Sequence, residues 1–319
     1  MSTRERVLVA LEDAGEAGVS GEALARELGV SRVAVAKHVT ALREQGYGIE
    51  AAPGVGYRLT HTPDVALPFE VARLLRDPLW CRFAGGVETA STNADARELA
   101  LAGAPEGTVV VAARQTGGRG RLGRTWESPE GGGYVSVVLR PGTAPAETGP
   151  LALVVGLGIA RGLRTLGVEV ELKWPNDVLL DGRKLAGILL EMVAESDRVE
   201  WVVAGVGLNA RRAPGSPGEA AYVSDVADLR VAAVAASALD GIASAYREWR
   251  TRGFASLAGE YAERLALLGE RVTVRDATGE VRASGVVEGI DADGRLLLRG
   301  EGGVVAVASG EVTLREPTA

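Results

Sequence analysis

A glycine-rich segment and a lysine-containing segment carry the residue types that chemistry on anionic groups requires. The first, residues 117–126, reads Gly-Gly-Arg-Gly-Arg-Leu-Gly-Arg-Thr-Trp and is called the arginine loop below. Glycine allows backbone N–H groups to line a concave nest, and each arginine adds forked donors that fit phosphate or carboxylate. The spacing also matches the dinucleotide fingerprint, but no helix pattern follows and no ribose-binding acid ends a second strand. The segment therefore predicts an anion-binding loop rather than a Rossmann site or a solvated basic turn.

The second segment contains two of the three lysines in the whole chain. Lys173 begins the sequence Lys-Trp-Pro-Asn-Asp, and Lys184 follows an Asp-Gly turn, so the two lysines lie on one predicted hairpin. A coding bias toward arginine explains the scarcity of lysine. It also leaves each remaining lysine as a candidate for a position where arginine does not substitute. The alternative is that Lys184 is a solvated strand residue.

Small residues recur in the strands that follow. An Ala-Gly pair at 186–187 lies just inside a predicted strand, and Gly-Val-Gly-Leu-Asn follows at 205–209. Glycine inside a strand indicates that another backbone or a flat group approaches closely. Asn209 adds an amide that is able to read an adenine edge.

The rarer residue types exclude several classes of site. The single cysteine, Cys81, excludes an intramolecular disulfide and a multi-cysteine zinc site. Both histidines lie in the first 61 residues, so the rest of the chain cannot hold a histidine-containing triad or a histidine-ligated metal. The first residues are charged, and the longest apolar stretch, 151–160, is shorter than a membrane span. We therefore expect a reduced, cytoplasmic protein with no membrane partner.

Length and composition predict an ordinary globular protein. The chain has 319 residues, of which 46% are hydrophobic and 24% charged, with a net charge of −7. This length suggests two or three domains. Glycine accounts for 43 residues, about twice the usual share, so particular loops must be rich in it.

Residues 1–60 predict three short helices followed by two strands. Ser20 and Ser31 are good N-caps for the second and third helices, and Gly-Val at 29–30 makes a tight turn between them. Strands are expected at 49–52 and 57–59, around a Pro-Gly turn. The buried stripe of the third helix is expected to be Val33, Val35, Val39 and Leu42. This order is typical of a winged helix-turn-helix.

Positive charge is concentrated on the third helix. Residues 32–43 contain no acidic side chain, whereas the first 60 residues as a whole are close to neutral. A cationic helix in this fold favours DNA binding over a winged helix that contacts only protein. The expected DNA-binding residues are Arg32, Lys37 and His38.

The remaining chain predicts two further domains. After a proline-containing linker at 61–68, strands are expected at 108–113, 134–139, 168–172, 188–193 and 201–205, and helices at 151–166, 231–249 and 254–267. This mixture without strict alternation predicts an α+β fold with a largely antiparallel sheet and helices on one side. Short strands at 271–275, 284–290, 295–298 and 304–308, separated by Asp- and Gly-containing turns, predict a small β-barrel. The expected domains are 1–62, 63–268 and 269–319.

Taken together, these segments resemble the biotin–protein ligase family. The resemblance is carried by Ser-Thr-Asn at 91–93, Gln115 with the arginine loop, 173–177, Arg-Lys-Leu-Ala-Gly-Ile at 183–188, and 205–209, in the family's order and spacing. With the winged helix in front, essentially the whole chain resembles the bifunctional type that also represses biotin genes. The resemblance implies a ligase domain of the class II synthetase-like type and an SH3-like C-terminal barrel.

The resemblance implies a two-step reaction. The carboxylate of biotin attacks the α-phosphate of ATP, which gives biotinyl-5′-AMP and pyrophosphate. A lysine of a biotin carboxyl carrier protein domain then attacks the mixed anhydride and releases AMP. Mg²⁺ is expected with ATP as co-substrate, and no tightly bound metal is expected. The other expected partners are operator DNA and, when biotinyl-AMP is bound, a second copy of the chain in a homodimer.

Roles for individual residues are implied in the same way. Lys184 and Arg119 are expected to be catalytic, and Asp177 is expected to help position Mg²⁺. Biotin is expected to contact Ser91, Thr92, Asn93, Gln115, Gly118, Arg119, Gly120, Arg121, Lys184 and Gly187. ATP and the adenylate are expected to contact Arg119, Arg121, Arg124, Trp126, Lys173, Asn176 and Asn209. The empty arginine loop is expected to be mobile, because nothing balances its three like charges or the backbone entropy.

Two alternative functions stay open on the sequence alone. A lipoate–protein ligase shares the catalytic fold, although the arginine loop and the segment 173–177 disfavour it. A repressor whose catalytic half only binds biotinyl-AMP is the non-enzymatic alternative.

Overall fold

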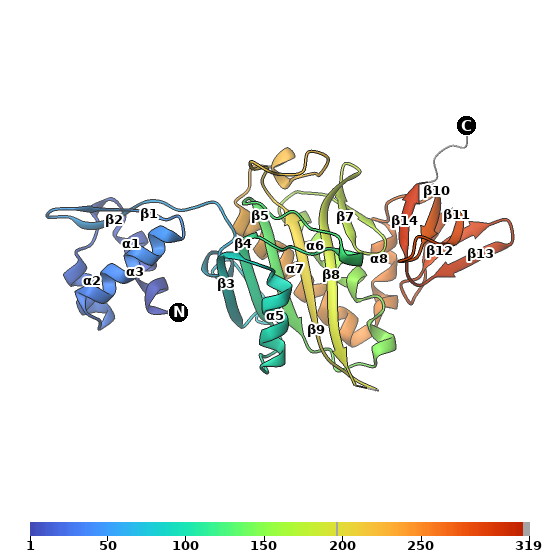
Figure 1. The fold of residues 1–319 in the computed structure, drawn as a ribbon, viewed down its shortest axis with the longest axis horizontal. Coiled ribbons are helices and arrows are strands. Elements are labelled where there is room, and N and C mark those ends of the chain that lie inside the picture. The colour runs from blue at the N-terminus through green and yellow to red at the C-terminus, as the bar shows by residue number, and fades with distance from the viewer. Residues whose placement is uncertain (196, 315–319) are drawn as a thin grey trace. The chain divides into compact units, whose positions relative to one another are not determined.

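The N-terminal part of the chain folds as a winged helix-turn-helix. The computed structural model describes residues 1–195 and 197–314, which belong to two compact units, Met1–Asp64 and Val65–Ala319 (Figure 1). In the first unit, α1 (Thr3–Ala14), α2 (Gly21–Leu28) and α3 (Arg32–Glu44) precede antiparallel strands β1 (Gly48–Ala52) and β2 (Gly56–His61). The side chains of Ser20 and Ser31 accept hydrogen bonds from backbone N–H groups at the start of α2 and α3, as predicted. The predicted fold of this unit is confirmed.

One residue of α3 lies on the opposite side from the prediction. Val35, Val39 and Leu42 are buried, but Val33 is 68% exposed. A helix turns by about 100° per residue, so Val33 and Val35 point to nearly opposite faces. The prediction that Val33 belongs to the buried stripe is therefore wrong.

The second unit is built on a seven-stranded sheet in the order β3-β4-β5-β9-β8-β7-β6. Its strands are β3 (Arg82–Thr89), β4 (Thr108–Gln115), β5 (Gly132–Leu139), β6 (Glu171–Lys173), β7 (Asp177–Leu180), β8 (Arg183–Ala194) and β9 (Val199–Asn209). Only β3 and β4 pair in parallel, and the five other neighbouring pairs are antiparallel. The largely antiparallel sheet is therefore confirmed. Residues 168–170, which were expected to be part of a strand, come before the short β6.

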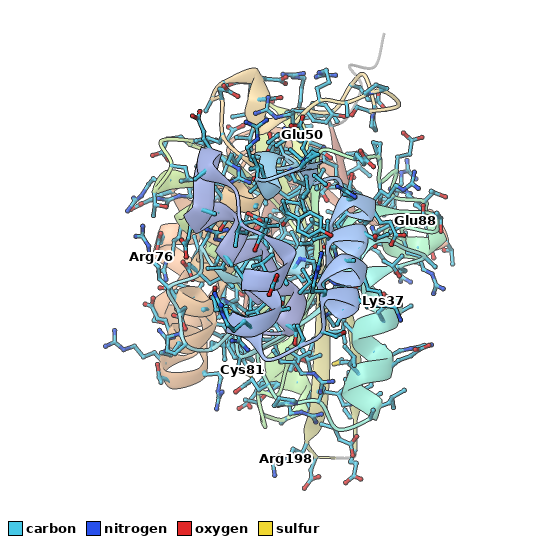
Figure 2. The ribbon with its side chains drawn as sticks, turned by 90° about the vertical axis from the view of Figure 1, so that its left-hand side faces the viewer. Lys37, Glu50, Arg76, Cys81, Glu88 and Arg198 are labelled. Atoms are coloured by element: carbon cyan, nitrogen blue, oxygen red, sulfur yellow. The ribbon has the colours of Figure 1, made fainter. Side chains whose placement is uncertain are left out.

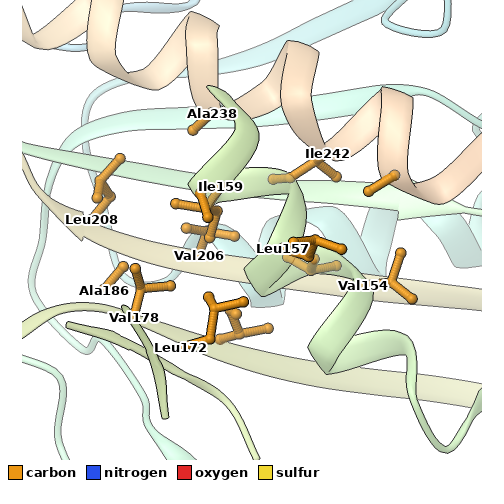
Figure 3. Close-up of a cluster of buried hydrophobic side chains, with 14 of the residues drawn as sticks. Val154, Leu157, Ile159, Leu172, Val178, Ala186, Val206, Leu208, Ala238 and Ile242 are labelled. Carbon is orange, nitrogen blue, oxygen red and sulfur yellow. The ribbon is translucent and has the colours of Figure 1, made fainter. Parts of the chain in front are cut away.

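Helices cover both faces of this sheet (Figure 1). The apolar α6 (Leu151–Arg164) and α7 (Val231–Arg252) pack on one face, where Val154, Leu157 and Ile159 meet side chains such as Val206 and Leu208 (Figure 3). On the other face lies α5 (Thr92–Leu101), whose buried apolar side chains against β4, β5 and β9 are the small Ala96 and Ala100. The prediction of helices on one side is wrong, because these small alanines give α5 a weak hydrophobic pattern.

The remaining helices are short. A five-residue α4 (Pro68–Ala72) opens the second unit, and the predicted helix at 254–267 is only a 3-10 turn, Phe254–Ser256, followed by α8 (Ala258–Ala262).

Helix α6 with the turn before it, Pro145–Arg164, would be long and apolar enough to span a membrane, but 72% of its apolar window is buried inside the protein. Arg161 in α6 forms ion pairs with Glu248 and Glu260, and its hydrogen bond holds the pKa of Glu260 below the usual range. This helix is therefore accounted for as a core helix of the fold.

The C-terminal strands form a second antiparallel sheet of five strands, in the order β13-β12-β11-β10-β14. They are β10 (Arg271–Arg275), β11 (Val281–Ile290), β12 (Leu296–Gly300), β13 (Gly303–Val307) and β14 (Glu311–Leu314). The last of these, β14, was not predicted. Buried side chains of this sheet join the main hydrophobic cluster, and the indole Nε1 of Trp174 donates to the carbonyl of Gly294 at 3.0 Å. The small β-domain thus packs directly on the domain that holds the seven-stranded sheet. Its predicted boundary at 268/269, like that at 62/63, stays a prediction.

Helices α6 and α7 cross at glycines. A Cβ added to Gly162 would lie 2.0 Å from the carbonyl oxygen of Ser237, and one added to Gly241 would lie 2.0 Å from that of Gly158. These distances are shorter than any van der Waals contact, so the crossing requires residues without a side chain.

Replacing Gly162 by alanine is expected to lower the free energy of unfolding by about 3 kcal/mol, because the added methyl group forces the two helices apart. Urea denaturation measures the change. The control is Gly259→Ala in α8, where an added Cβ meets nothing within 4 Å; that change is expected to be neutral or slightly stabilising. Equal stability of Gly162→Ala and the unsubstituted protein would contradict the close crossing.

Candidate active site

Most of the predicted site residues line one pocket on the sheet face that carries α5. The pocket has a volume of about 140 Å³ and is formed by the start of α5, the end of β4, the arginine loop, the β7–β8 hairpin and β9. The predicted residues that line it are Ser91, Thr92, Asn93, Gln115, Arg119, Gly120, Arg121, Arg124, Trp126, Asn176, Lys184 and Gly187. Segments far apart in sequence are thus brought together as expected.

Three predicted residues lie outside this lining. Gly118 is buried within the arginine loop, where an added Cβ would lie 2.4 Å from the carbonyl oxygen of Trp126. Asn209 is buried, and its side-chain amide donates to the carbonyl oxygen of Lys184 at 3.4 Å. Lys173 pairs with Asp177 in the β6–β7 ladder. The contacts with biotin or adenylate assigned to these three stay predictions.

The floor of the pocket consists of glycines on two paired strands. Gly187 of β8 lies directly opposite Gly207 of β9. Gly205, two residues before Gly207 in β9, lies on the same face of the sheet. The indole of Trp126 lies against this floor. A Cβ added to Gly207 would lie 2.3 Å from the indole Nε1, and a Cβ added to Gly187 would lie 2.8 Å from the indole Cζ3. A Cβ added to Gly205 would collide with the side-chain amide of Asn93. The close approach predicted from the small residues is therefore made by two side chains of the site itself.

A β-bulge brings Lys184 to this floor. Val178 of β7 pairs with Ala186, but the next residue, Leu179, pairs with Lys184, so Leu185 is an extra residue in β8. Without the bulge, residues 184 and 187 would point to opposite faces of the sheet, because side chains alternate along a strand. With it, the Lys184 side chain passes 3.3 Å from the position of a Cβ on Gly187 and shares the pocket face.

The Lys184 ammonium lies between a carboxylate and an aromatic ring. Its Nζ is 2.7 Å from Asp177 Oδ1 and 5.2 Å from the centre of the Trp126 ring. Asp177 Oδ1 and Trp126 Nε1 are both buried and lack a well-oriented hydrogen-bond partner among the described residues. The contact with Asp177 is therefore ionic and poorly directional. Such an ammonium can turn toward an incoming anion without breaking a well-formed hydrogen bond.

The arginine loop forms a small hairpin, and two of its arginines bond residues distant in sequence. The N–H of Gly120 donates to the carbonyl of Arg124 at 2.7 Å, and that of Trp126 donates to Gly118 at 3.0 Å. Arg121 donates to the side chain of Asn176 and to the carbonyl of Gly310, and Arg124 pairs with Glu311 at 2.6 Å. The prediction that nothing balances these charges is wrong for Arg124, because its carboxylate partner comes from β14, almost two hundred residues away in sequence.

A buried polar network holds the α5 side of the pocket. The hydroxyl of Ser136 lies 2.8 Å from Thr92 Oγ1 and 2.6 Å from Asn93 Oδ1. Asn93 in turn donates to Glu191 at 3.0 Å, and the backbone N–H of Thr92 donates to the Gln115 side chain at 2.8 Å. The network fixes three predicted ligand-binding residues before any ligand arrives.

The return limb of the arginine loop is fastened to the same network. The side-chain amide of Gln115 donates to the hydroxyl of Ser128 at 2.9 Å, and Ser128 donates to the carbonyl of Trp126 at 3.0 Å. The phenol of Tyr134 donates to the carbonyl of Pro129 at 2.7 Å. Burial raises the pKa of Tyr134, so its hydroxyl stays a neutral donor at physiological pH.

Sequence reasoning missed some residues of this site. Ser136 was detectable, since it is the one small polar side chain in the otherwise apolar interior of the predicted strand 134–139. Glu311 gave no signal, because β14 was not predicted and nothing local links it to the loop. Further lining residues that were not assigned a role are Thr125, Ile188, Leu189, Gly205, Val206 and Gly207.

The charges in the pocket suit an anionic ligand. Four cations, Lys184, Arg119, Arg121 and Arg124, face the two carboxylates of Asp177 and Glu311. The net positive charge and forked arginine donors fit phosphate groups, while the amide and hydroxyl groups near α5 fit a neutral polar ligand. The pocket therefore suits an anionic group beside a neutral polar one.

The predicted DNA-binding residues lie on α3 in the first unit. Arg32 and Lys37 are exposed, and Lys37 is visible on the outer side of the helix in Figure 2. His38 is half-buried and lies to the side of that face.

Three family models match the chain in succession. One described as "HTH domain" matches residues 3–58, one described as "Biotin/lipoate A/B protein ligase family" matches 86–209, and one described as "Biotin protein ligase C terminal domain" matches 267–315. These matches agree with the order of the winged helix, the seven-stranded sheet and the C-terminal sheet.

Similar proteins cover most or all of the chain. "Bifunctional ligase/repressor BirA" of Bacillus subtilis is 35% identical over 98% of this chain and 99% of its own length. "Biotin--[acetyl-CoA-carboxylase] ligase" of Paracoccus denitrificans is 39% identical over 70% of this chain and 97% of its own. The solved structure of biotin protein ligase from Aquifex aeolicus in complex with biotin and ATP is similar with a TM-score of 0.63 and 30% identity, covering 74% of this chain and 99% of that one.

The resemblance predicted from the motifs is thus confirmed by similarity along the whole chain. Because near-complete coverage of a relative at 35% identity coincides with all three models in order, the chain belongs to the biotin–protein ligase family, in its bifunctional form with an N-terminal helix-turn-helix domain.

Proposed function

We propose that this chain activates biotin with ATP as biotinyl-5′-AMP, transfers the biotinyl group to a lysine of a biotin carboxyl carrier protein domain, and represses transcription in response to biotin. The observation that carries the ligase activity is the placing of Lys184 beside the arginine loop on a glycine floor. Similarity to an Aquifex aeolicus enzyme solved with biotin and ATP supports the same ligands here.

The first step brings two anions together. Two unit charges about 4 Å apart at an effective dielectric constant near 20 repel by about 4 kcal/mol, which corresponds to roughly a thousandfold in rate. Lys184 would lie between the biotin carboxylate and the α-phosphate and offset this repulsion as charge moves onto the phosphoryl oxygens. Arg119, which is exposed at the pocket mouth, would bind the same phosphate.

The rest of the lining divides by chemistry. Ser91, Thr92, Asn93 and Gln115 would hold the polar ring system of biotin, with Gly118, Gly120, Arg121 and Gly187 around it. Arg121, Arg124, Trp126, Lys173, Asn176 and Asn209 would hold ATP and then the adenylate. The two arginines that now bond Gly310 and Glu311 line the pocket and would exchange these partners for phosphate oxygens.

Mg²⁺ is proposed to enter with the phosphates of ATP, where it would offset their charge. Asp177 is the pocket carboxylate suited to it, because its buried Oδ1 lacks a well-oriented hydrogen-bond donor among the described residues.

Replacing Ser136 by alanine is expected to raise KM for biotin about tenfold with little change in kcat, because Thr92 and Asn93 lose the hydroxyl that fixes them. Steady-state ATP–pyrophosphate exchange at varied biotin concentration measures the split. The control is Ser256→Ala, whose hydroxyl bonds only its own turn at Gly253 among the described residues. An unchanged KM in Ser136→Ala would contradict the role of the network.

The ligase activity is tested by labelling a carrier protein with ATP and radiolabelled biotin. Label on the carrier lysine, together with biotin-dependent ATP–pyrophosphate exchange, is the expected result. Exchange with lipoate but not biotin would favour a lipoate–protein ligase, and adenylate binding without any transfer would favour a non-catalytic sensor.

Repression would require two winged helices on one operator, since a palindromic site mirrors a twofold dimer. We therefore propose a homodimer that forms when biotinyl-AMP is bound, acting in the cytoplasm on operator DNA through Arg32, Lys37 and His38. Sedimentation with and without biotinyl-AMP tests this, and an unchanged mass would contradict it.

A further inference from the structure

The outer face of α3 combines cations with an apolar side chain. Val33, Ala36, Lys37 and Thr40 are all exposed and follow one another at helical spacing, opposite the buried Val35, Val39 and Leu42. Val33 is 68% exposed, the largest value for any valine among the exposed hydrophobic residues of the described chain. A helix face that only met solvent would gain nothing from this branched apolar side chain.

Val33 also borders a groove between α3 and the β1–β2 hairpin. The groove has a volume of about 520 Å³, and its lining is mostly small or apolar: Gly21, Arg32, Val33, Ala36, Ala51, Ala52, Pro53, Gly56 and Tyr57. The cation of the hairpin, Arg58, is paired with Glu50 at 2.8 Å, so it is partly neutralised. The attraction for an anionic partner therefore comes from α3, where Arg32 and Lys37 lie beside Val33 and no residue from 32 to 43 is acidic.

Duplex DNA presents an apolar group that matches this arrangement. In the major groove, the 5-methyl group of thymine distinguishes thymine from the other bases, and it is read by apolar contact with side chains. Phosphate contacts from flanking cations position a helix but carry no base information themselves. Val33, projecting between two such cations, has the right chemistry and position for base readout.

We infer that Val33 reads a thymine methyl group and is a specificity-determining residue for operator DNA. This inference rests on the proposed DNA-binding function and adds to it the identity of one recognised base. Ala36, one turn farther along the same face, leaves room for the base to approach the helix backbone. Arg32 and Lys37 supply affinity that does not depend on sequence.

The test uses the full chain with biotin and ATP. Duplexes that it binds are first selected from a random library, and each thymine of the selected site is then replaced singly by deoxyuridine, which lacks only the methyl group. Fluorescence anisotropy at fixed salt gives Kd for each duplex. At one position, loss of the methyl group is expected to weaken binding about fourfold, the weight of one buried methyl group.

The variant Val33→Ala is expected to bind the thymine and uracil duplexes equally at that position. Because Val33 is exposed, the substitution leaves the core of the unit intact. The matched control is Lys37→Gln, which is expected to weaken both duplexes alike, to lower the salt dependence by about one unit, and to keep the fourfold preference.

The outcomes separate the two levels of the proposal. If the protein selects and binds a site but Val33→Ala keeps the full preference for thymine over uracil, the role of Val33 is overturned while DNA binding stands. If no duplex is enriched and none binds at low salt, the proposed repressor function fails, and the inference fails with it.

Discussion

Replacing Lys184 by glutamine is expected to reduce biotin-dependent ATP–pyrophosphate exchange by about a thousandfold. The amide keeps a polar N–H donor on a slightly shorter side chain but loses the charge that offsets repulsion between carboxylate and α-phosphate, about 4 kcal/mol on the dielectric argument given above. Lys184→Gln also leaves Asp177, now 2.7 Å from the ammonium, as an uncompensated negative charge in the pocket. Both effects oppose the approach of two further anions.

The matched control is Arg183→Gln, which removes one positive charge from the neighbouring residue. Arg183 pairs with Asp225 on the surface and does not line the pocket, so its loss is expected to change exchange by less than about threefold. Lys184→Arg separates charge from shape: a planar guanidinium keeps the charge but cannot shift between two acceptors as a compact ammonium does, so partial activity is expected. Undiminished exchange and carrier labelling by Lys184→Gln would contradict the catalytic role of this lysine.

Much of the site could be predicted because its chemistry is local in sequence. The arginine loop, the hairpin that contains Lys173 and Lys184, and the glycines at 187, 205 and 207 can each be recognised from residue type. Together these segments carry the resemblance to the family. Their side chains then meet because β4, β8 and β9 are close in one sheet. The local sequence could therefore suggest each segment of the pocket, whereas the pairing of the strands in the sheet brings these segments together.

What could not be predicted depends on long-range geometry. The bulge at Leu185 that turns Lys184 toward the pocket could not be predicted, because it depends on the register in which β7 and β8 pair. The pairing of Arg124 with Glu311 joins segments 187 residues apart. Val33, by contrast, could have been excluded from the core on the sequence alone, because it precedes Val35 by two residues, or about 200° of helical turn, and so faces the other way.

The glycine floor leads to the second large effect: Gly207→Ala is expected to lower kcat/KM for biotin about a hundredfold. An added Cβ would lie 2.3 Å from Trp126 Nε1 and 2.4 Å from its Cε2, and a rigid indole cannot relieve such a clash by changing only its tip. The ring must therefore leave the floor. That movement also removes the aromatic face 5.2 Å from the Lys184 ammonium and pulls on the arginine loop, which contains Trp126.

A double-mutant cycle tests whether the effect passes through the indole. In a Trp126→Ala background, Gly207→Ala is expected to lower kcat/KM for biotin by less than about a further threefold, because the ring that it displaces is already gone. The strand control is Gly86→Ala in β3, where an added Cβ meets nothing within 4 Å, and circular dichroism confirms that each variant is folded. A full hundredfold loss in the Trp126→Ala background would mean that the methyl group acts on the ligand directly. Full activity of Gly207→Ala would mean that the indole does not need this floor.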